Sequence, residues 1–280
     1  MTSPLIAAAA LAAIADDPTT RLADVRWYLD KPGRGHQAYH EGHLPGAVFV
    51  DLDRHLCAPE GPGRHPLPER STFAATMGRL GFGDDHFIVV YDDTGGTIAA
   101  RLWWMLRDVG HEAVRVLDGG IDAWSAAGHP LNTDAPDMTP RILTVRPGLT
   151  RQIDRETLAG RLETITLLDA RDPARYRGEV EPIDPVAGHI PTARSAPTAA
   201  NLDAAGRLRT PDDLAEHFRA LAPAGEVVVY CGSGVTACHD VLAMTVAGLP
   251  EPTLYPGSWS DWSSAGMPAA TGDEPGEVTE

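Results

Sequence analysis

The stretch Val227-Val228-Val229-Tyr230-Cys231-Gly232-Ser233-Gly234-Val235-Thr236-Ala237 decides the fold of this chain. Its first four residues are β-branched or aromatic, which predicts a buried strand of a parallel sheet. Gly232 and Gly234 permit a tight loop after the strand. Apolar residues at three- and four-residue spacing then predict a helix from Val235 to Gly248. The order of strand, glycine loop and helix is typical of α/β folds, which bind ligands at the carboxyl ends of their strands.

Cys231 stands at the end of this strand, where the glycine loop can turn its backbone N–H groups toward the sulfur. These N–H groups and the helix N-terminus favour negative charge, so we expect a thiol pKa below the usual value of about 8.5. The alternative is a small buried hydrophobic residue, which is the usual situation of a free cysteine. A core cysteine needs no Gly-X-Gly loop after it, so we interpret Cys231 as a nucleophile.

The composition is that of a soluble globular chain with no basic partner surface. Of the 280 residues, 43% are apolar and 22% are charged, which suits one large or two ordinary domains. The net charge of −16 disfavours nucleic acid or an anionic membrane surface as the main partner. No apolar stretch is long enough to span a bilayer.

The three cysteines, Cys57, Cys231 and Cys238, lack the spacing of a metal site, and no metal is expected. The apolar segment 4–15 lacks a preceding basic region, so we expect an amphipathic helix there rather than an export signal. Together these features predict a protein of the reducing cytoplasm.

Four sequence features occur twice in the same order, which predicts a duplicated domain. They are the Asp-X-Arg strand ends (Asp24–Arg26 and Asp169–Arg171), the Gly-His-X-Pro turns (42–45 and 188–191), the strands that end at Asp92 and Cys231, and the tryptophan segments around Trp124 and Trp262. Short apolar strands alternate with helical patterns in each half, so each copy should be a mostly parallel sheet flanked by helices.

We place the N-terminal domain at 1–134, a linker at 135–149 and the C-terminal domain at 150–280, with a frayed acidic tail at 272–280. Asp92 stands where the second copy has Cys231. A carboxylate cannot carry sulfur, so the C-terminal domain is expected to be catalytic and the N-terminal domain to shape the site.

These motifs, and above all the loop Cys231–Ala237, resemble the tandem-domain rhodanese-type sulfurtransferases over nearly the whole chain. The Cys-Gly-Ser-Gly-Val-Thr loop is similar to that of the 3-mercaptopyruvate sulfurtransferases, whereas relatives that use thiosulfate carry basic residues in it. The resemblance implies an α/β fold of two tandem rhodanese-like domains. It also implies transfer of a sulfane sulfur from 3-mercaptopyruvate through a Cys231 persulfide, without a cofactor.

The resemblance further implies what surrounds the persulfide. Its cradle would be the loop residues Gly232, Gly234, Val235 and Thr236. The acceptor would be a thiol, such as thioredoxin or a small thiol, or cyanide in the test tube. Thiosulfate is the alternative donor.

In this family an arginine grips the acid group of the donor, and Arg175 falls on that position. Animal-type members have a second arginine at the position that Asp184 occupies here. This difference from the family pattern leaves the preferred donor open. A relay of aspartate, histidine and loop serine implies Asp53, His65 and Ser233 as catalytic residues. For His65 the alternative is a loop histidine without a catalytic part.

Two other functional classes fit less well. Cysteine phosphatases share the fold but need an arginine at the end of the loop, where this chain has Ala237. A non-catalytic sulfur carrier or interaction module fits the copy with Asp92 but not the copy with Cys231. Structural roles are expected for the histidines of the Gly-His turns, for the two Asp-X-Arg pairs, for most tryptophans and for Cys238.

Overall fold

The structure, a computed structural model, describes residues 3–278 and divides the chain into two compact units. Unit 1 contains the residues up to Ala58 together with Pro68–Leu149 and Ala204–Leu208. Unit 2 contains Pro59–Leu67, Thr150–Asp203 and the residues from Arg209 onward. The segment 59–67 thus packs with unit 2, although it lies within the first 134 residues.

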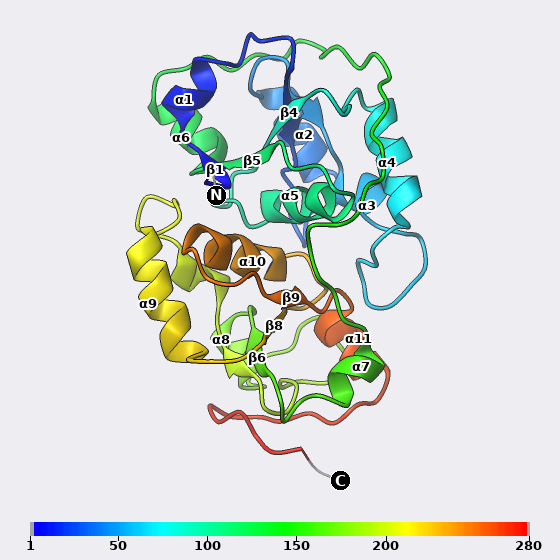
Figure 1. Cartoon of the computed structure of the whole chain (residues 1–280), viewed down its shortest axis with the longest axis vertical. Coiled ribbons are helices and arrows are strands. Elements are labelled where there is room, and N and C mark those ends of the chain that lie inside the picture. Colours follow the sequence, from blue (N-terminus) through cyan, green and yellow to red (C-terminus); the bar gives the residue numbers. More distant parts are fainter. Residues whose placement is uncertain (1–2, 279–280) are drawn as a thin grey trace. The chain divides into compact units, whose positions relative to one another are not determined.

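Unit 1 is a five-stranded parallel sheet with strand order β1-β5-β4-β2-β3 and flanking helices (Figure 1). Its helix α5 packs on β4 and β5, and α1 packs against α6. The elements are β1 Leu5–Ile6, α1 Ala8–Ala12, β2 Thr20–Asp24, α2 Arg34–Glu41, β3 Val48–Phe49, α3 Leu52–His55, α4 Arg70–Arg79, β4 Phe87–Tyr91, α5 Ala99–Asp108, β5 Val114–Leu117 and α6 Gly120–Ala126.

Unit 2 is a four-stranded parallel sheet with strand order β7-β6-β8-β9. The elements are α7 Arg155–Ala159, β6 Thr166–Asp169, α8 Pro173–Tyr176, β7 Arg194–Ser195, the 3₁₀ helix η1 Thr198–Asn201, α9 Pro211–Leu221, β8 Val227–Tyr230, α10 Ala237–Val246, β9 Thr253–Leu254 and α11 Ser258–Ser264. The predicted α/β class, with a parallel sheet and helices in each unit, is confirmed.

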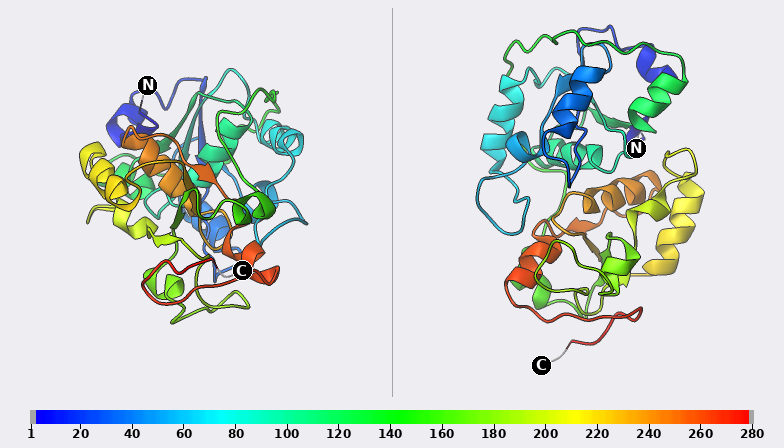
Figure 2. Two further views of the ribbon diagram at one scale, coloured as in Figure 1. Left: turned by 60° about the horizontal axis from the view of Figure 1, so that its bottom comes forward. Right: turned by 180° about the vertical axis from the view of Figure 1, so that it is seen from behind.

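The strand β8 is the centre of unit 2. It lies between β6 and β9, and its Val228 and Tyr230 are buried in a core that includes Trp259 and Trp262. The helix α10 packs on β8 and β9 and lies beside α9, as both views of Figure 2 show. Because β8 ends at Tyr230 and α10 begins at Ala237, the loop that carries Cys231 lies at the carboxyl edge of the sheet.

The two units repeat one another in hydrogen bonds as well as in sequence. The backbone N–H of Leu44 donates to the hydroxyl of Tyr91, and that of Ile190 donates to the hydroxyl of Tyr230, both at 3.1 Å. The indole N–H of each repeated tryptophan donates to a proline carbonyl six residues further on, from Trp124 to Pro130 and from Trp262 to Pro268. These shared bonds support the predicted duplication.

The predicted structural pairs are also confirmed. Asp24 pairs with Arg26, and Asp169 pairs with Arg171, with an N–O distance of 2.6 Å in both units. The histidines of the Gly-His turns, His43 and His189, each bond a backbone carbonyl through Nδ1. Each also stacks on a tyrosine ring.

Two local expectations were wrong. The segment 4–15 is not one helix, because Leu5 and Ile6 pair with Val116 and Leu117 as the edge strand β1 and only Ala8–Ala12 is helical. The prediction of a frayed tail is wrong for the residues up to Pro275, because the carbonyls of Glu274 and Pro275 accept hydrogen bonds from His189 and Thr192. The last two residues of the predicted tail, 279–280, lie outside the described part. No helix within residues 3–278 is long and apolar enough to cross a membrane.

Candidate active site

Cys231 is held by the first residues of α11. Its side chain is buried, with 1% of the residue exposed. Its backbone N–H donates to the hydroxyl of Ser258 at 3.1 Å, and its carbonyl accepts from the N–H of Trp259 at 2.9 Å. The Oγ atom of Ser258 lies 4.0 Å from Sγ of Cys231 and also bonds the carbonyl of Tyr255. The backbone of Cys231 is therefore fixed at both its N–H and its carbonyl.

Ser258 has a strained backbone conformation, with a φ of +55°. The matching residue of unit 1 is Gly120, at a φ of +57°, and the next residue there, Ile121, donates to the carbonyl of Asp92 at 3.0 Å. Such a conformation costs a non-glycine residue roughly 1–3 kcal/mol. In unit 2 this conformational strain therefore occurs at Ser258, the residue whose hydroxyl contacts the backbone and the sulfur of Cys231.

The loop glycines are required by close packing. A Cβ atom on Gly234, which has a φ of +74°, would lie 2.2 Å from the carbonyl oxygen of Pro256. No side chain fits at that distance, so Gly234 lets the loop close tightly over the turn before α11. Behind the loop, the thiol of Cys238 is fully buried and contacts the carbonyl of Gly234 at 3.5 Å, which agrees with its predicted place in the core.

The equivalent loop of unit 1 holds an anion. The carboxylate of Asp92 is buried and accepts four backbone N–H bonds of 2.8–2.9 Å, which come from Thr94, Gly96, Ile98 and Ala99. A cluster of inward N–H groups stabilises negative charge strongly. The loop after Cys231 matches this one in the preceding strand, in one left-handed glycine (Gly95 and Gly234) and in the following helix, so it is suited to hold an anionic sulfur.

Ser233 and His65 form the polar side of the loop. The hydroxyl of Ser233 lies 2.7 Å from Nδ1 of His65, and both residues are nearly buried. The segment 59–67 brings His65 to this place, although 168 residues separate the two in sequence. The third residue of the implied relay, Asp53, belongs to unit 1, where its carboxylate accepts from the indole N–H of Trp27 at 2.9 Å. Its part in a relay stays a prediction.

Two guanidinium groups face the loop at Gly232. A Cβ atom on Gly232 would lie 3.0 Å from Nη2 of Arg64 and 3.4 Å from Nη1 of Arg175. In the part of the chain that the structure describes, these two nitrogens have no hydrogen-bonding partner. Arg64 and Arg175 therefore direct free donors at the residue next to Cys231.

Buried carboxylates hold both arginines from behind. Asp184 forms ion pairs with Arg64 and Arg175, and Glu181 binds Arg175 through two hydrogen bonds of 2.8 and 3.0 Å from its Nη2. Burial raises the pKa of Asp184, with the two arginines opposing the rise. Burial works in the same direction on Glu181, but its hydrogen bonds with Arg175 and nearby backbone N–H groups lower its pKa overall. Asp184 stands where animal-type members of the family have a second arginine. It thus positions a different arginine, Arg64.

Comparisons with known proteins identify the family of the chain. The model of the rhodanese-like domain family matches residues 7–127 and 154–265. The chain belongs to the rhodanese-like family. It is accordingly a sulfurtransferase with two rhodanese-like domains.

Among its relatives, a Pseudomonas aeruginosa protein named as a probable 3-mercaptopyruvate sulfurtransferase is 45% identical over 279 residues, covering 96% of this chain and 98% of the relative. A Mycobacterium tuberculosis protein, SseB, is 44% identical over 273 residues, covering 93% and 94%, and its name assigns it provisionally to the thiosulfate sulfurtransferases. The crystal structure of SseA from Escherichia coli, a 3-mercaptopyruvate sulfotransferase, superposes with a TM-score of 0.82 at 33% identity and covers 92% of this chain and 100% of SseA.

The sequence did not reveal Arg64 and Ser258. Arg64 directly precedes His65, and a cation beside a histidine predicted to be catalytic was the available signal. Ser258 stands at the position of Gly120 in the repeat, so a hydroxyl residue in place of a glycine could have drawn attention.

Within residues 3–278, no group of three or more His, Cys, Asp or Glu side chains is placed to hold a metal ion.

Proposed function

We propose that this sulfurtransferase takes its sulfur from 3-mercaptopyruvate and carries it as a persulfide on Cys231. The two relatives above carry names that point to different donors at nearly equal identity, so similarity does not decide between them. The observation that carries the proposal is the hydrogen bond between Ser233 and His65 beside the nucleophile. Loss of sulfur from mercaptopyruvate leaves an enolate that must gain a proton, and a hydroxyl–imidazole pair can supply it.

In the first step the thiolate of Cys231 attacks the donor sulfur. The S–S bond forms as the C–S bond breaks, and the electron pair of that bond leaves with the three-carbon fragment as the enolate of pyruvate. Ser233 stabilises the enolate oxygen, and a proton passed through His65 completes pyruvate. Arg175 and Arg64 hold the donor carboxylate in charge-assisted hydrogen bonds. The loop N–H groups near Gly232, Val235 and Thr236 stabilise the persulfide, as the equivalent loop stabilises Asp92.

In the second step a thiol takes the outer sulfur and releases the thiolate of Cys231. A thioredoxin-type protein or a small thiol can serve as this acceptor. We place the reaction in the cytoplasm, a proposal supported by three cysteines that are all free thiols in the described structure. We assign the chemistry to the C-terminal domain, because Asp92 replaces the nucleophile in the N-terminal one.

Thiosulfate is the second candidate donor. The two guanidinium groups at Gly232 also suit a dianion, so the neutral loop does not by itself exclude it. If thiosulfate were the donor, sulfite would leave without needing a proton, and the Ser233–His65 pair would have no role in the reaction.

The test is a comparison of kcat/KM for 3-mercaptopyruvate and for thiosulfate, with Cys231→Ser as the inactive control. Mass spectrometry of the enzyme after donor alone should show one added sulfur atom on wild-type protein and none on Cys231→Ser. A clear preference for thiosulfate would reject the proposed donor. Full activity of Cys231→Ser would reject the whole scheme.

A further inference from the structure

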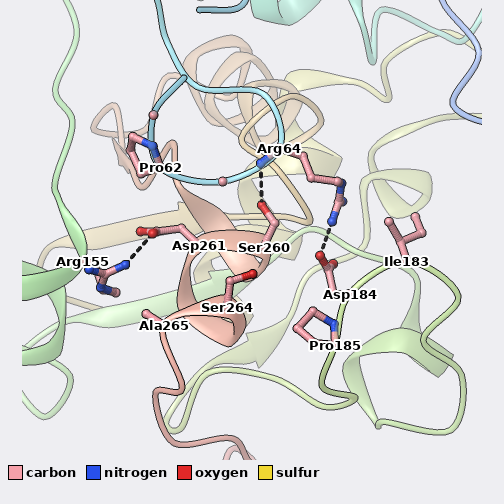
Figure 3. Close-up of a pocket in the computed structure, with 12 residues that line it drawn as sticks. Pro62, Arg64, Arg155, Ile183, Asp184, Pro185, Ser260, Asp261, Ser264 and Ala265 are labelled. Carbon is pink, nitrogen blue, oxygen red and sulfur yellow. Dashed lines mark hydrogen bonds and ion pairs between the residues drawn. The ribbon is translucent and has the colours of Figure 1, made fainter. Parts of the chain in front are cut away.

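A pocket of about 590 Å³ lies in unit 2 between the segment 61–64, the start of α7, residues 183–185 and the helix α11 (Figure 3). Its floor is made of small residues, among them Ser260, Ser264 and Ala265 of α11. Two ion pairs flank it, Arg155 with Asp261 and Arg64 with Asp184. In Figure 3, Arg155 and Arg64 lie on opposite sides of the two serines. The pocket is open to small polar molecules.

Both arginines that line this pocket are more exposed than the aspartates they pair with. In the first ion pair, 28% of the Arg155 side chain is exposed but only 9% of that of Asp261. In the second pair the values are 26% for Arg64 and 3% for Asp184. The other terminal nitrogen of Arg155 pairs at 2.9 Å with Glu156, whose side chain is 75% exposed, so a bound carboxylate would take the place of Glu156. A chain with a net charge of −16 therefore presents a local site for an anionic group.

The pocket adjoins the loop of the nucleophile. The backbone N–H of Ser260 donates to the carbonyl of Gly232 at 2.9 Å, and its hydroxyl accepts from the N–H of Arg64 at 3.1 Å. One pocket residue is thus bonded to the neighbour of Cys231. The donor carboxylate already has its own place, because the inner nitrogens of Arg64 and Arg175 face Gly232.

We propose that this pocket binds the sulfur acceptor, a small thiol that carries a carboxylate, with Arg155 as the anchor of that carboxylate. The inference rests on the proposed persulfide chemistry of Cys231. The acceptor thiolate attacks the outer sulfur of the persulfide, a new S–S bond forms on the acceptor, and the old S–S bond breaks. Its electron pair returns to Sγ of Cys231, which is released as the thiolate that the first step requires, and the proton of the acceptor thiol goes to solvent. The products are the acceptor persulfide and the free enzyme.

The experiment compares two acceptors that differ mainly in charge, 3-mercaptopropionate and 2-mercaptoethanol, at saturating 3-mercaptopyruvate. The quantity of interest is the ratio of kcat/KM for the two thiols, because misfolding lowers both values together. Arg155→Gln, which removes the charge, and Ser264→Trp, which fills the pocket, should each lower this ratio about 10-fold. The matched controls are Arg161→Gln, which removes a paired arginine elsewhere in unit 2, and Ala126→Trp at the position of α6 that matches Ser264.

A second readout does not depend on turnover. Titration calorimetry with the unreactive thioether 3-(methylthio)propionate should show binding to wild-type protein that Arg155→Gln weakens about 10-fold. Equal binding by wild type and Arg155→Gln would overturn the pocket assignment, as would an unchanged ratio of acceptors. A higher KM for 3-mercaptopyruvate in Arg155→Gln, with the acceptor ratio unchanged, would assign the pocket to the donor instead. A loss of turnover with thioredoxin alone would assign it to a protein acceptor. If wild-type protein failed to turn over 3-mercaptopyruvate with any thiol, the proposed function would fall, while the calorimetry would still judge the pocket.

Discussion

The hydroxyl oxygen of Ser233 lies 2.7 Å from Nδ1 of His65, and this bond joins the nucleophile loop to the segment 59–67. The segment belongs to unit 2 in the fold but comes from the first quarter of the sequence. The bond places an imidazole beside the loop hydroxyl, a pair that can transfer a proton under the proposed mechanism. The pair should matter only to a donor whose leaving group needs a proton.

Ser233→Ala should therefore discriminate between donors. We expect kcat with 3-mercaptopyruvate to fall about 100-fold, the scale of general acid catalysis, while kcat with thiosulfate falls less than about threefold. Steady-state kinetics with both donors on one preparation measures this, and the thiosulfate rate reports on folding. Equal losses for the two donors would contradict a proton-transfer role.

Arg64 and Arg175 should act on donor binding rather than on chemistry. Each replaced by Ala should raise KM for 3-mercaptopyruvate about 10-fold or more, with a smaller change in kcat, because a charge-assisted hydrogen bond to the donor is lost. The control is Arg177→Ala, which removes a partly exposed arginine of the same segment that pairs with Glu179. A KM for Arg64→Ala equal to that of the control would remove Arg64 from the donor site.

Ser258→Gly should separate stability from activity. Glycine relieves the strain of a φ of +55°, but the variant loses a buried hydroxyl that bonds the N–H of Cys231 and the carbonyl of Tyr255. The two effects are each about 1–3 kcal/mol and oppose one another, so the free energy of unfolding should change by less than about 1.5 kcal/mol. The lost hydroxyl also lies near the sulfur of Cys231, so turnover should fall about 10-fold. Urea unfolding and persulfide formation with excess donor measure the two effects. A variant that is strongly destabilised and fully active would contradict both parts.

Asp240 should make stability depend on pH. This fully buried residue of α10 accepts a 2.6 Å hydrogen bond from Asn201, yet burial raises its pKa to about 8, with a smaller contribution from Asp169. Between about pH 4 and pH 8 the native state keeps a proton that the unfolded chain has lost. The free energy of unfolding should then decrease as pH rises through this window, by roughly 1 kcal/mol per pH unit.

Asp240→Asn should flatten that slope, since the amide does not titrate. Urea midpoints of wild type and variant at several pH values between 5 and 9 measure the difference. Parallel slopes for the two proteins would show that another group controls the pH dependence.

Much of the fold could be predicted because its signals are local. The runs Phe87–Tyr91 and Val227–Tyr230 are apolar and bounded by glycine loops, and both are strands with those limits. The edge strand β1 could not be predicted, since two apolar residues before a helix carry no periodicity of their own. Only the partner β5 makes Leu5 and Ile6 a strand.

In the candidate site, too, the residues that could be predicted are those with local sequence signals. The sequence placed Cys231 and its glycines because strand, loop and helix are contiguous. The role of Asp184 could not be read, because it depends on Arg64, which lies 120 residues away in the chain. From the sequence alone, Asp184 was noted only because it stands where the family has a second arginine. In the fold it is a carboxylate that fixes the position of an arginine supplied by another segment.

The four backbone bonds to Asp92 bear on the history of the duplication. In unit 1 the carboxylate of Asp92 is a permanent part of the chain, whereas the persulfide that we propose for Cys231 would form and be consumed in every cycle. Asp92 therefore stabilises its loop permanently but cannot be exchanged. Under the proposed mechanism, the same loop motif has a structural role in one copy and carries sulfur in the other.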